Sequence, residues 1–188
     1  MLNKEDGNRL LKLARQTVKD YFRKSELRIK KTKFNQKRGV FVTIKNVDGK
    51  LRGCVGYPYP KYPLGEAVQK AAITAAFEDS RFTPLSQQEL DKILFEISVL
   101  TEPEIIEVKN PHEYLEKIKI GEDGLIVEFG SQNGLLLPQV AKEHGLDAER
   151  FLCHTCLKAW LPPDKWMDGE TKIYKFQAQI FKEGFNQT

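Results

Sequence analysis

The chain has 188 residues, 40% of them hydrophobic and 30% charged, and its formal net charge is +4. This balance allows a buried core of domain size and excludes a chain that is disordered over most of its length. No apolar run approaches the roughly 18 residues that a membrane-spanning helix needs, and the first residues lack the pattern of a signal peptide. Three cysteines, an odd number, are typical of free thiols, so we expect a cytoplasmic protein without a membrane partner.

The first part of the chain predicts a helix and then a hairpin. Apolar residues at helical spacing predict an amphipathic helix over roughly residues 6–24. The segments "GVFVTIKN" and "LRGCVGY" have strand patterns, and Asp48-Gly49 between them suits a tight turn. Cys54 therefore lies on the second strand of the predicted hairpin.

An alanine-rich helix and a buried strand are predicted next. Pro63 stands where the helix begins, and the small residues of its apolar stripe favour close packing against a sheet. Ser86 and Glu89 match a capping box, in which two reciprocal hydrogen bonds begin a helix. Residues 92–100 alternate as in a strand whose two faces are both partly covered.

The second half of the chain predicts shorter elements. "GEDG" (121–124) and "SQNG" (131–134) are turn patterns around the predicted strands "LIVEF" and "LLL". Pro138 is expected to open a short helix that ends near Gly145, and Asp147 is expected to cap another.

The last predicted element is one strand near the C-terminal end. In "TKIYKFQAQIFKE" the alternation places four side chains inward, those of Tyr174, Phe176, Ala178 and Ile180. Hairpins mixed with helices, without a regular βαβ rhythm, predict an α+β fold.

The stretch Arg52-Gly53-Cys54-Val55-Gly56 is the strongest candidate site. A nearby cation makes a cysteine nucleophilic by stabilising its thiolate, and in a regular strand Arg52 shares a face with Cys54. The glycines leave room for a ligand or a second backbone, and a turn there could aim N–H groups at an anion. Three prolines within residues 58–63 would hold the adjoining loop still. Local spacing alone nevertheless favours a packing cysteine in a bulged strand, with Arg52 paired to a carboxylate.

The C-x2-C pattern Cys153-His154-Thr155-Cys156 is typical of zinc sites and of thiol redox sites. Cys54 or His144 could complete four ligands, but the sequence holds no second paired-ligand motif. On the predicted helix Cys156 lies near the apolar face, whereas Cys153 leans toward solvent. We therefore expect core packing for Cys156, and no metal or other cofactor.

Histidines are the usual partners of a nucleophilic cysteine. His144 and His154 are the candidates here, although nothing in the sequence places either beside Cys54. His112 follows Asn110-Pro111 at a helix start and is expected to be exposed.

Asp79 and Arg81, in "FEDSRFTPL", follow the alanine-rich helix directly. An acid and a guanidinium at such a place could grip a carboxylate or a phosphate. They could equally pair with each other or with backbone, which is the interpretation that spacing alone favours.

A basic stretch over residues 23–38 is a crude nucleic-acid footprint, with Phe34 as a candidate stacking platform. Charge runs are usually solvated faces, so we disfavour nucleic-acid binding. The basic residues are Arg23, Lys24, Arg28, Lys30, Lys31, Lys33, Lys37 and Arg38.

Four segments together resemble the AMMECR domain family: "GVFVTIKNVDGKLRGCVG", "AAFEDSRFTPLSQQEL", "FEISVLTEPE" and "GLLLPQVAKEHGLDAERFLCHTCLKAWLPPDKW". The resemblance runs from about residue 6 to residue 182, and L-R-G-C-[IV]-G is its hallmark. It implies one α+β domain over residues 1–188, with mainly antiparallel sheets and flanking helices, divided into a large lobe and a smaller one. The family's biochemical activity is unknown.

The resemblance implies a functional surface around two motifs. The hallmark falls on residues 51–56, and the family's D-x-R-F pattern falls on Asp79, Arg81 and Phe82. Carried over, it makes Cys54 and Arg52 the candidate catalytic residues. The candidate ligand-binding residues are Arg52, Gly53, Gly56, Asp79 and Arg81.

The resemblance also implies partners. The family's domain is often encoded beside, or fused to, a Memo-like protein, with a radical SAM enzyme nearby. Such neighbourhood is an associational argument for a shared pathway. Any metal or cluster would belong to those proteins.

The chain departs from the family pattern at one position. Cys156, Lys158 and Ala159 fit a later motif, but Trp160 replaces its usual glycine. A large indole there is expected to fill or line space nearby.

Three hypotheses of function follow. The first is a module that binds a small molecule or peptide in the groove of Arg52 and Cys54; the second is an enzyme with Cys54 as thiolate nucleophile. The third is nucleic-acid binding through residues 23–38. The sequence shows a binding surface but no complete catalytic apparatus, so we favour the first and leave open whether the protein is an enzyme.

Overall fold

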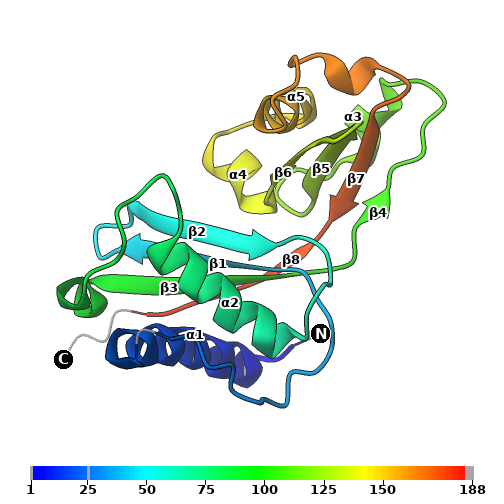
Figure 1. Ribbon diagram of the computed structural model, residues 1–188. Helices are drawn as coiled ribbons and strands as arrows, with labels where there is room; N and C mark the ends of the chain where they lie inside the picture. The colour runs from blue at the N-terminus through cyan, green and yellow to red at the C-terminus, as the bar shows by residue number, and fades with distance from the viewer. Residues whose placement is uncertain (1, 25, 185–188) are drawn as a thin grey trace. The chain divides into compact units, whose positions relative to one another are not determined.

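The structure is a computed structural model that describes residues 2–24 and 26–184. It has an α+β fold in two compact units (Figure 1): one holds the described residues up to Leu100 and from Gln179 onward, the other Thr101–Ala178. In chain order the elements are α1 (Lys4–Lys24), β1 (Val40–Asn46), β2 (Leu51–Tyr57), α2 (Leu64–Phe77), the 3₁₀ helix η1 (Gln87–Lys92), β3 (Ile93–Leu100), β4 (Glu104–Ile105), α3 (Glu113–Lys117), β5 (Gly124–Phe129), β6 (Gln132–Leu136), α4 (Pro138–Glu143), α5 (Ala148–Lys158), the 3₁₀ helix η2 (Lys165–Met167), β7 (Lys172–Phe176) and β8 (Ala178–Lys182).

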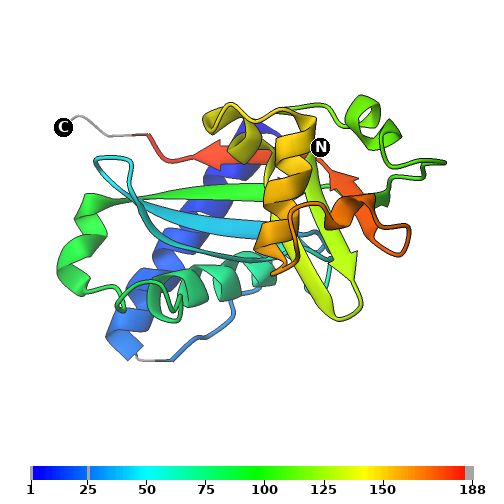
Figure 2. The same cartoon turned by 90° about the horizontal axis from the view of Figure 1, so that it is seen from above.

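The first unit is a four-stranded sheet in the order β2-β1-β3-β8, with α1 and α2 packed on one face (Figures 1 and 2). Strand β1 pairs antiparallel with both β2 and β3. Its residues Val40, Val42 and Ile44 are fully buried in the core that the helices cover. Because side chains alternate along a strand, Thr43 and its cross-strand neighbours lie on the opposite face.

The predicted hairpin is confirmed, and it contains a bulge that the pattern does not show. Ile44 pairs with Gly53 but Lys45 pairs with Leu51, so Arg52 is the extra residue on β2. A bulge bends the strand and re-aims the residue that it leaves unpaired. The direction of Arg52 is therefore not the one that regular alternation predicts.

Close packing of α2 on the hairpin explains both its alanines and one hallmark glycine. A Cβ at Gly53 would lie 2.1 Å from the carbonyl oxygen of Ala75 on α2. Only a residue without a side chain lets the helix backbone approach the strand so closely. The helix itself begins at Leu64, after Pro63, as the sequence predicts.

The second unit is a four-stranded sheet in the order β4-β7-β5-β6, with α5 across one face (Figure 2). Asp147 caps α5, since its side chain accepts a hydrogen bond from the backbone N–H of Arg150. Cys156 is fully buried in this unit's core, and Cys153 packs partly buried beside it. The cap and the core position of Cys156 are confirmed.

Two sequence predictions in the second half are wrong. The last segment forms two strands in different sheets, β7 and β8, and the buried side chains of β7 are Ile173 and Phe176 rather than Tyr174. The interruption lies at Gln177, close to the boundary between the two units after Ala178. The "SQNG" turn is also misplaced: Phe129 pairs with Gln132, and Gly130 supplies the positive φ of a two-residue turn.

Trp160 does not fill space, contrary to the expectation from its size. Its side chain is 90% exposed, and its φ of 60° places it in the left-handed region directly after the cap of α5. Glycine is the usual residue there because it adopts this conformation without strain. The indole therefore extends into solvent while the backbone keeps the turn.

We expect Gly53→Ala to lower the free energy of unfolding by about 1–3 kcal/mol, because the new methyl group forces α2 away from β2. Urea unfolding followed by circular dichroism measures this change. Gly169→Ala is the matched control, since nothing lies within 4 Å of a Cβ there. Equal midpoints for the two variants would contradict the close approach at Gly53.

Candidate functional site

Two sequence motifs 25 residues apart meet at the outer edge of β2. The backbone N–H of Cys54 donates to Oδ2 of Asp79 at 2.9 Å, and Nη2 of Arg81 donates to the carbonyl oxygen of Cys54 at 3.1 Å. Strand β2 is an edge strand, so these backbone groups have no neighbouring strand to bind. The pair Asp79–Arg81 takes the place of that strand at Cys54.

Asp79 and Arg81 also hold each other. Nε of Arg81 lies 2.9 Å from Oδ1 of Asp79, and Nη2 lies 2.7 Å from Oδ2, a two-point ion pair. Together with the bond to the Cys54 amide, these contacts lower the pKa of Asp79 to about 2, the hydrogen bonds from Arg81 contributing most. The carboxylate is buried, whereas the side chain of Arg81 is 48% exposed. The guanidinium is thus fixed at one end and open to solvent at the other.

The thiol of Cys54 sits in a row of polar side chains across the sheet. Its neighbour on β1 is Thr43, whose Oγ1 lies 3.2 Å from Sγ, and the next residue in register, on β3, is Glu96. Burial raises the pKa of the Cys54 thiol, and the opposing effects of Thr43 and Arg81 do not outweigh it. The thiol is therefore protonated at neutral pH.

Arg52 does not stabilise the thiolate in the way that strand alternation predicts. The bulge turns it to Glu89, with Nε 2.7 Å from Oε1 and Nη2 3.3 Å from Oε2. Glu89 also completes the predicted capping box, accepting from the backbone N–H and hydroxyl of Ser86. These contacts, led by the hydrogen bond from Arg52, lower the pKa of Glu89 to about 2. The cation that acts on the thiol is Arg81.

Glu96 is the buried acid of the site. Its side chain is 6% exposed, and its Oε2 accepts from Nζ of Lys45 at 3.3 Å and of Lys182 at 3.1 Å. Two ammonium groups thus face one carboxylate, while Arg52–Glu89 and Arg81–Asp79 are neutral pairs. The polar face carries a net charge of +1 over these groups, which favours an anionic ligand.

The space beside the two hallmark glycines is filled by protein atoms. Helix α2 occupies it at Gly53, and at Gly56 a Cβ would lie 2.5 Å from the ring of Phe41. The close approach that we expected there is the packing of a second backbone and of a ring. The open side of the site is that of Arg81.

The AMMECR1 family model matches residues 11–181 of this chain. The chain belongs to the AMMECR1 family. It is 50% identical over 186 residues to a protein of Methanocaldococcus jannaschii, covering 97% of this chain and 92% of that one. It is 53% identical to a protein of Methanothermobacter thermautotrophicus, covering 97% and 96%.

A solved structure of the family has the same fold. The crystal structure of an uncharacterized protein from Pyrococcus horikoshii matches with a TM-score of 0.93 and 47% identity, covering 98% of this chain and 94% of that one. The expected family and fold class are thereby confirmed.

Sequence reasoning missed two residues of the site, Thr43 and Glu96. Each is a polar residue in a strand whose neighbours are apolar, "VFVTIKN" and "ILFEISVL". A carboxylate at a buried strand position is rarely tolerated without a partner, so Glu96 was the detectable exception. The order of the strands in the sheet, which places Thr43 beside Cys54 and Glu96 beside Thr43, required the structure.

The C-x2-C residues and the histidines all lie in the second unit. His112, His144 and His154 are exposed, as expected for His112. Among the described residues, no three His, Cys, Asp or Glu side chains are grouped so as to hold a metal ion.

Three residues of the basic stretch pair with acids of their own unit. Arg28 pairs with Glu26, Lys30 with Asp20 and Lys33 with Asp6. Phe34 packs partly buried against the core with Lys33 over its ring, so it is no free stacking platform. Ser25 and the side chain of Lys24 lie outside what the structure describes. No helix of the described chain has the length and apolarity to span a membrane.

We expect Asp79→Asn to reduce the acid sensitivity of the fold. A carboxyl whose pKa falls on folding adds stability above its ordinary pKa of 3.8, and this stability is lost as the pH falls toward 2. The shift to about 2 corresponds to about 2 kcal/mol at neutral pH. Urea unfolding between pH 2 and 6 measures the slope.

The asparagine still has an oxygen that can accept from the Cys54 amide, so the fold is kept. Glu116→Gln, at an exposed position, is the control. An Asp79→Asn slope equal to that of the unmodified protein would contradict the lowered pKa.

We expect the alkylation rate of Cys54 by iodoacetamide to rise with a midpoint above the ordinary thiol value of about 8.5. Mass spectrometry assigns the modified cysteine. Arg81→Gln should move the midpoint further up, because the nearby positive charge is lost, whereas Arg52→Gln should leave it unchanged. A midpoint well below 8.5 that responds to Arg52→Gln alone would restore the activated nucleophile predicted from strand alternation.

Proposed function

We propose that this AMMECR1 protein is a binding module whose site is the polar face around Cys54 and Arg81. It recognises a carboxylate or phosphate group of a small molecule or of a peptide. The observation that carries the proposal is the state of Arg81, whose guanidinium is anchored on Asp79 and on the Cys54 carbonyl but remains half exposed. Nη1 has no hydrogen-bond partner among the described residues, so it is a fixed donor that can meet a ligand.

Preorganisation supports this proposal. Binding is weakened by the entropy of ordering flexible side chains, and arginine is the side chain suited to planar, two-point recognition of oxoanions. Here Asp79 has already ordered the guanidinium, and Lys45 and Lys182 add the net positive charge of the same face. A protonated thiol beside the guanidinium offers one more weak donor.

Catalysis by Cys54 is the second candidate, and one observation favours it. The row Cys54–Thr43–Glu96 places a hydroxyl between a thiol and a carboxylate. The pKa of the Cys54 thiol is raised in the structure without a ligand. Binding of an anionic ligand at Arg81 would exclude water and add a negative charge, and both changes would alter this pKa. This candidate requires a covalent adduct or a turnover at Sγ, whereas the binding module requires neither.

The partners implied by the family resemblance remain part of the proposal. A Memo-like protein and a radical SAM enzyme would receive or supply the ligand that the module holds. The pairing of Arg28, Lys30 and Lys33 with acids, and the packing of Phe34 against the core, argue against nucleic acid as the partner.

The proposal predicts saturable binding of a simple carboxylate at Arg81. N-acetylglycine is titrated into ¹⁵N-labelled protein, and the amide of Cys54 and Nε of Arg81 are followed by NMR. We expect both signals to shift, and Arg81→Gln to weaken binding at least tenfold, as for loss of a charged hydrogen bond. Inorganic phosphate, titrated separately, distinguishes a phosphate site from a carboxylate site.

Arg28→Gln is the matched control, because Arg28 is an exposed arginine paired with Glu26. NMR shifts that do not saturate with either anion would contradict the proposed binding module. Shifts of the Cys54 amide that persist in Arg81→Gln would contradict it as well. A mass increase on Cys54 with an acyl donor would favour the enzyme instead.

A further inference from the structure

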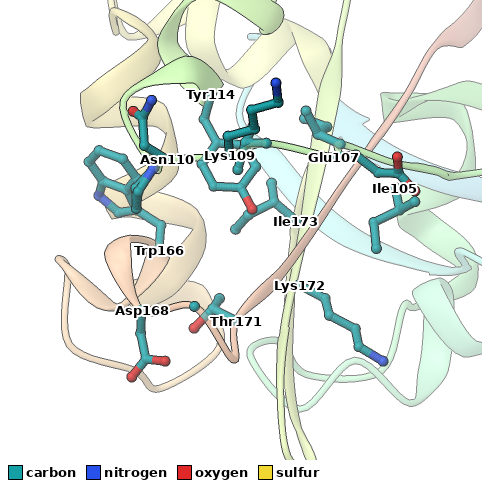
Figure 3. Close-up of a pocket in the computed structure, with 14 residues that line it drawn as sticks. Ile105, Glu107, Lys109, Asn110, Tyr114, Trp166, Asp168, Thr171, Lys172 and Ile173 are labelled. Carbon is teal, nitrogen blue, oxygen red and sulfur yellow. The ribbon is translucent and has the colours of Figure 1, made fainter.

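A cavity of about 450 Å³ opens on the surface of the second unit and belongs to neither motif discussed above. Its walls come from residues 105–111, from the first turn of α3 and from the segment between η2 and β7 (Figure 3). A volume of this size falls within the range that small-molecule sites occupy. All of its lining residues lie within one unit.

The floor of this cavity is apolar and aromatic. Ile173 and Trp166 are buried core residues that also line it, and Ile105 at its margin is 49% exposed. Val108 and Pro111 complete the apolar surface. An exposed isoleucine beside buried aromatic rings forms an apolar surface that the apolar part of a ligand can cover.

Two polar groups of buried aromatic residues are unpaired here. Trp166 is 2% exposed, and its Nε1 has no hydrogen-bond partner in the described part of the chain. Tyr114 is 7% exposed, its hydroxyl likewise forms no hydrogen bond with any described residue, and burial raises its pKa. Buried donors are usually satisfied, so the enclosed Nε1 of Trp166 is an exception, whereas the Tyr114 hydroxyl, on a residue that lines the cavity, can donate to a ligand there.

Charge at the rim favours an anion. Lys109 and Lys172 form no ion pair with a described residue, and they extend to opposite margins with Ile173 between them (Figure 3). Glu107 is the one lining acid without a described ion pair, since Asp168 pairs with Lys165 at 2.6 Å. Two free ammonium groups against one carboxylate leave a net charge of +1.

One wall is held in place before any ligand binds. Oδ1 of Asp168 accepts from the backbone N–H of Glu170, and the backbone N–H of Thr171 donates to the carbonyl of Asp168. The Thr171 hydroxyl donates to the carbonyl of Lys165. This turn fixes the wall that residues 168–171 form, so a ligand that binds there loses little binding energy to the ordering of the wall.

We propose that this cavity binds a small organic anion with an apolar body. The body lies against Ile105, Val108 and Ile173, and the acid group meets Lys109 or Lys172. The Tyr114 hydroxyl donates to an oxygen of the same ligand.

The chain offers a built-in reporter for this proposal. It has two tryptophans, of which Trp160 is 90% exposed and Trp166 lines the cavity. In a Trp160→Phe background the fluorescence comes from Trp166 alone. Phenylacetate is the probe, phenylacetamide its uncharged analogue, and inorganic phosphate the anion without an apolar body.

We expect saturable change in Trp166 emission with phenylacetate, and weaker binding of both phenylacetamide and phosphate. Tyr114→Phe keeps the ring and should weaken phenylacetate binding about fivefold, the effect of one hydrogen bond. Lys172→Ala, at an exposed position, tests the charge without touching the core. Lys158→Ala on α5 is the matched control, and Arg81→Gln should leave this binding unchanged.

Unaltered Trp166 emission, or equal affinity of phenylacetamide, would overturn the proposal. Phosphate binding as tightly as phenylacetate would also overturn it, because the apolar body would then contribute nothing. Lys172→Ala stays informative if Tyr114→Phe does not fold. Loss of phenylacetate binding in Arg81→Gln would place the ligand at the Cys54 site instead.

Discussion

The open edge of β2 is the constraint on which the candidate site depends. An edge strand exposes N–H and C=O groups that invite pairing with another chain, and proteins close such edges in various ways. Here Asp79 and Arg81 close it at a single residue, Cys54, by accepting from its N–H and donating to its C=O. The thiol is held where the segment 51–56 meets the pair Asp79–Arg81.

That closure has electrostatic consequences. Arg81 keeps Asp79 ionised and is fixed by it, so the guanidinium is ordered without a ligand. The bulge at Arg52 directs this side chain away from the thiol. Arg52 instead forms a second ion pair, with Glu89, which joins β2 to η1. Burial then leaves Cys54 protonated. An ordered cation beside a protonated thiol favours the binding of an anion over nucleophilic attack by the thiol.

The second unit has different chemistry. Its cavity combines apolar walls with the hydroxyl of Tyr114 and the unpaired Nε1 of Trp166, and its charges lie at the rim. The Cys54 site, in contrast, is a polar row on a sheet face with its charges mostly paired. Variants of separate residues, Arg81→Gln at one site and Lys172→Ala at the other, therefore distinguish the two proposals.

Local sequence determined much of this protein. Periodicity and turn chemistry predicted α1, the β1–β2 hairpin, α2, the Ser86–Glu89 capping box and the Asp147 cap, because each depends on residues close in the chain. The hallmark segment and the D-x-R-F pattern also identified Cys54, Asp79 and Arg81. Only the tertiary structure decided that Arg81 rather than Arg52 acts on the thiol, since a bulge re-aims the side chain of the residue that it leaves unpaired. It alone placed Thr43 beside Cys54 and Glu96 beside Thr43, and it divided the last strand between two sheets, because strand order is fixed by packing between distant segments.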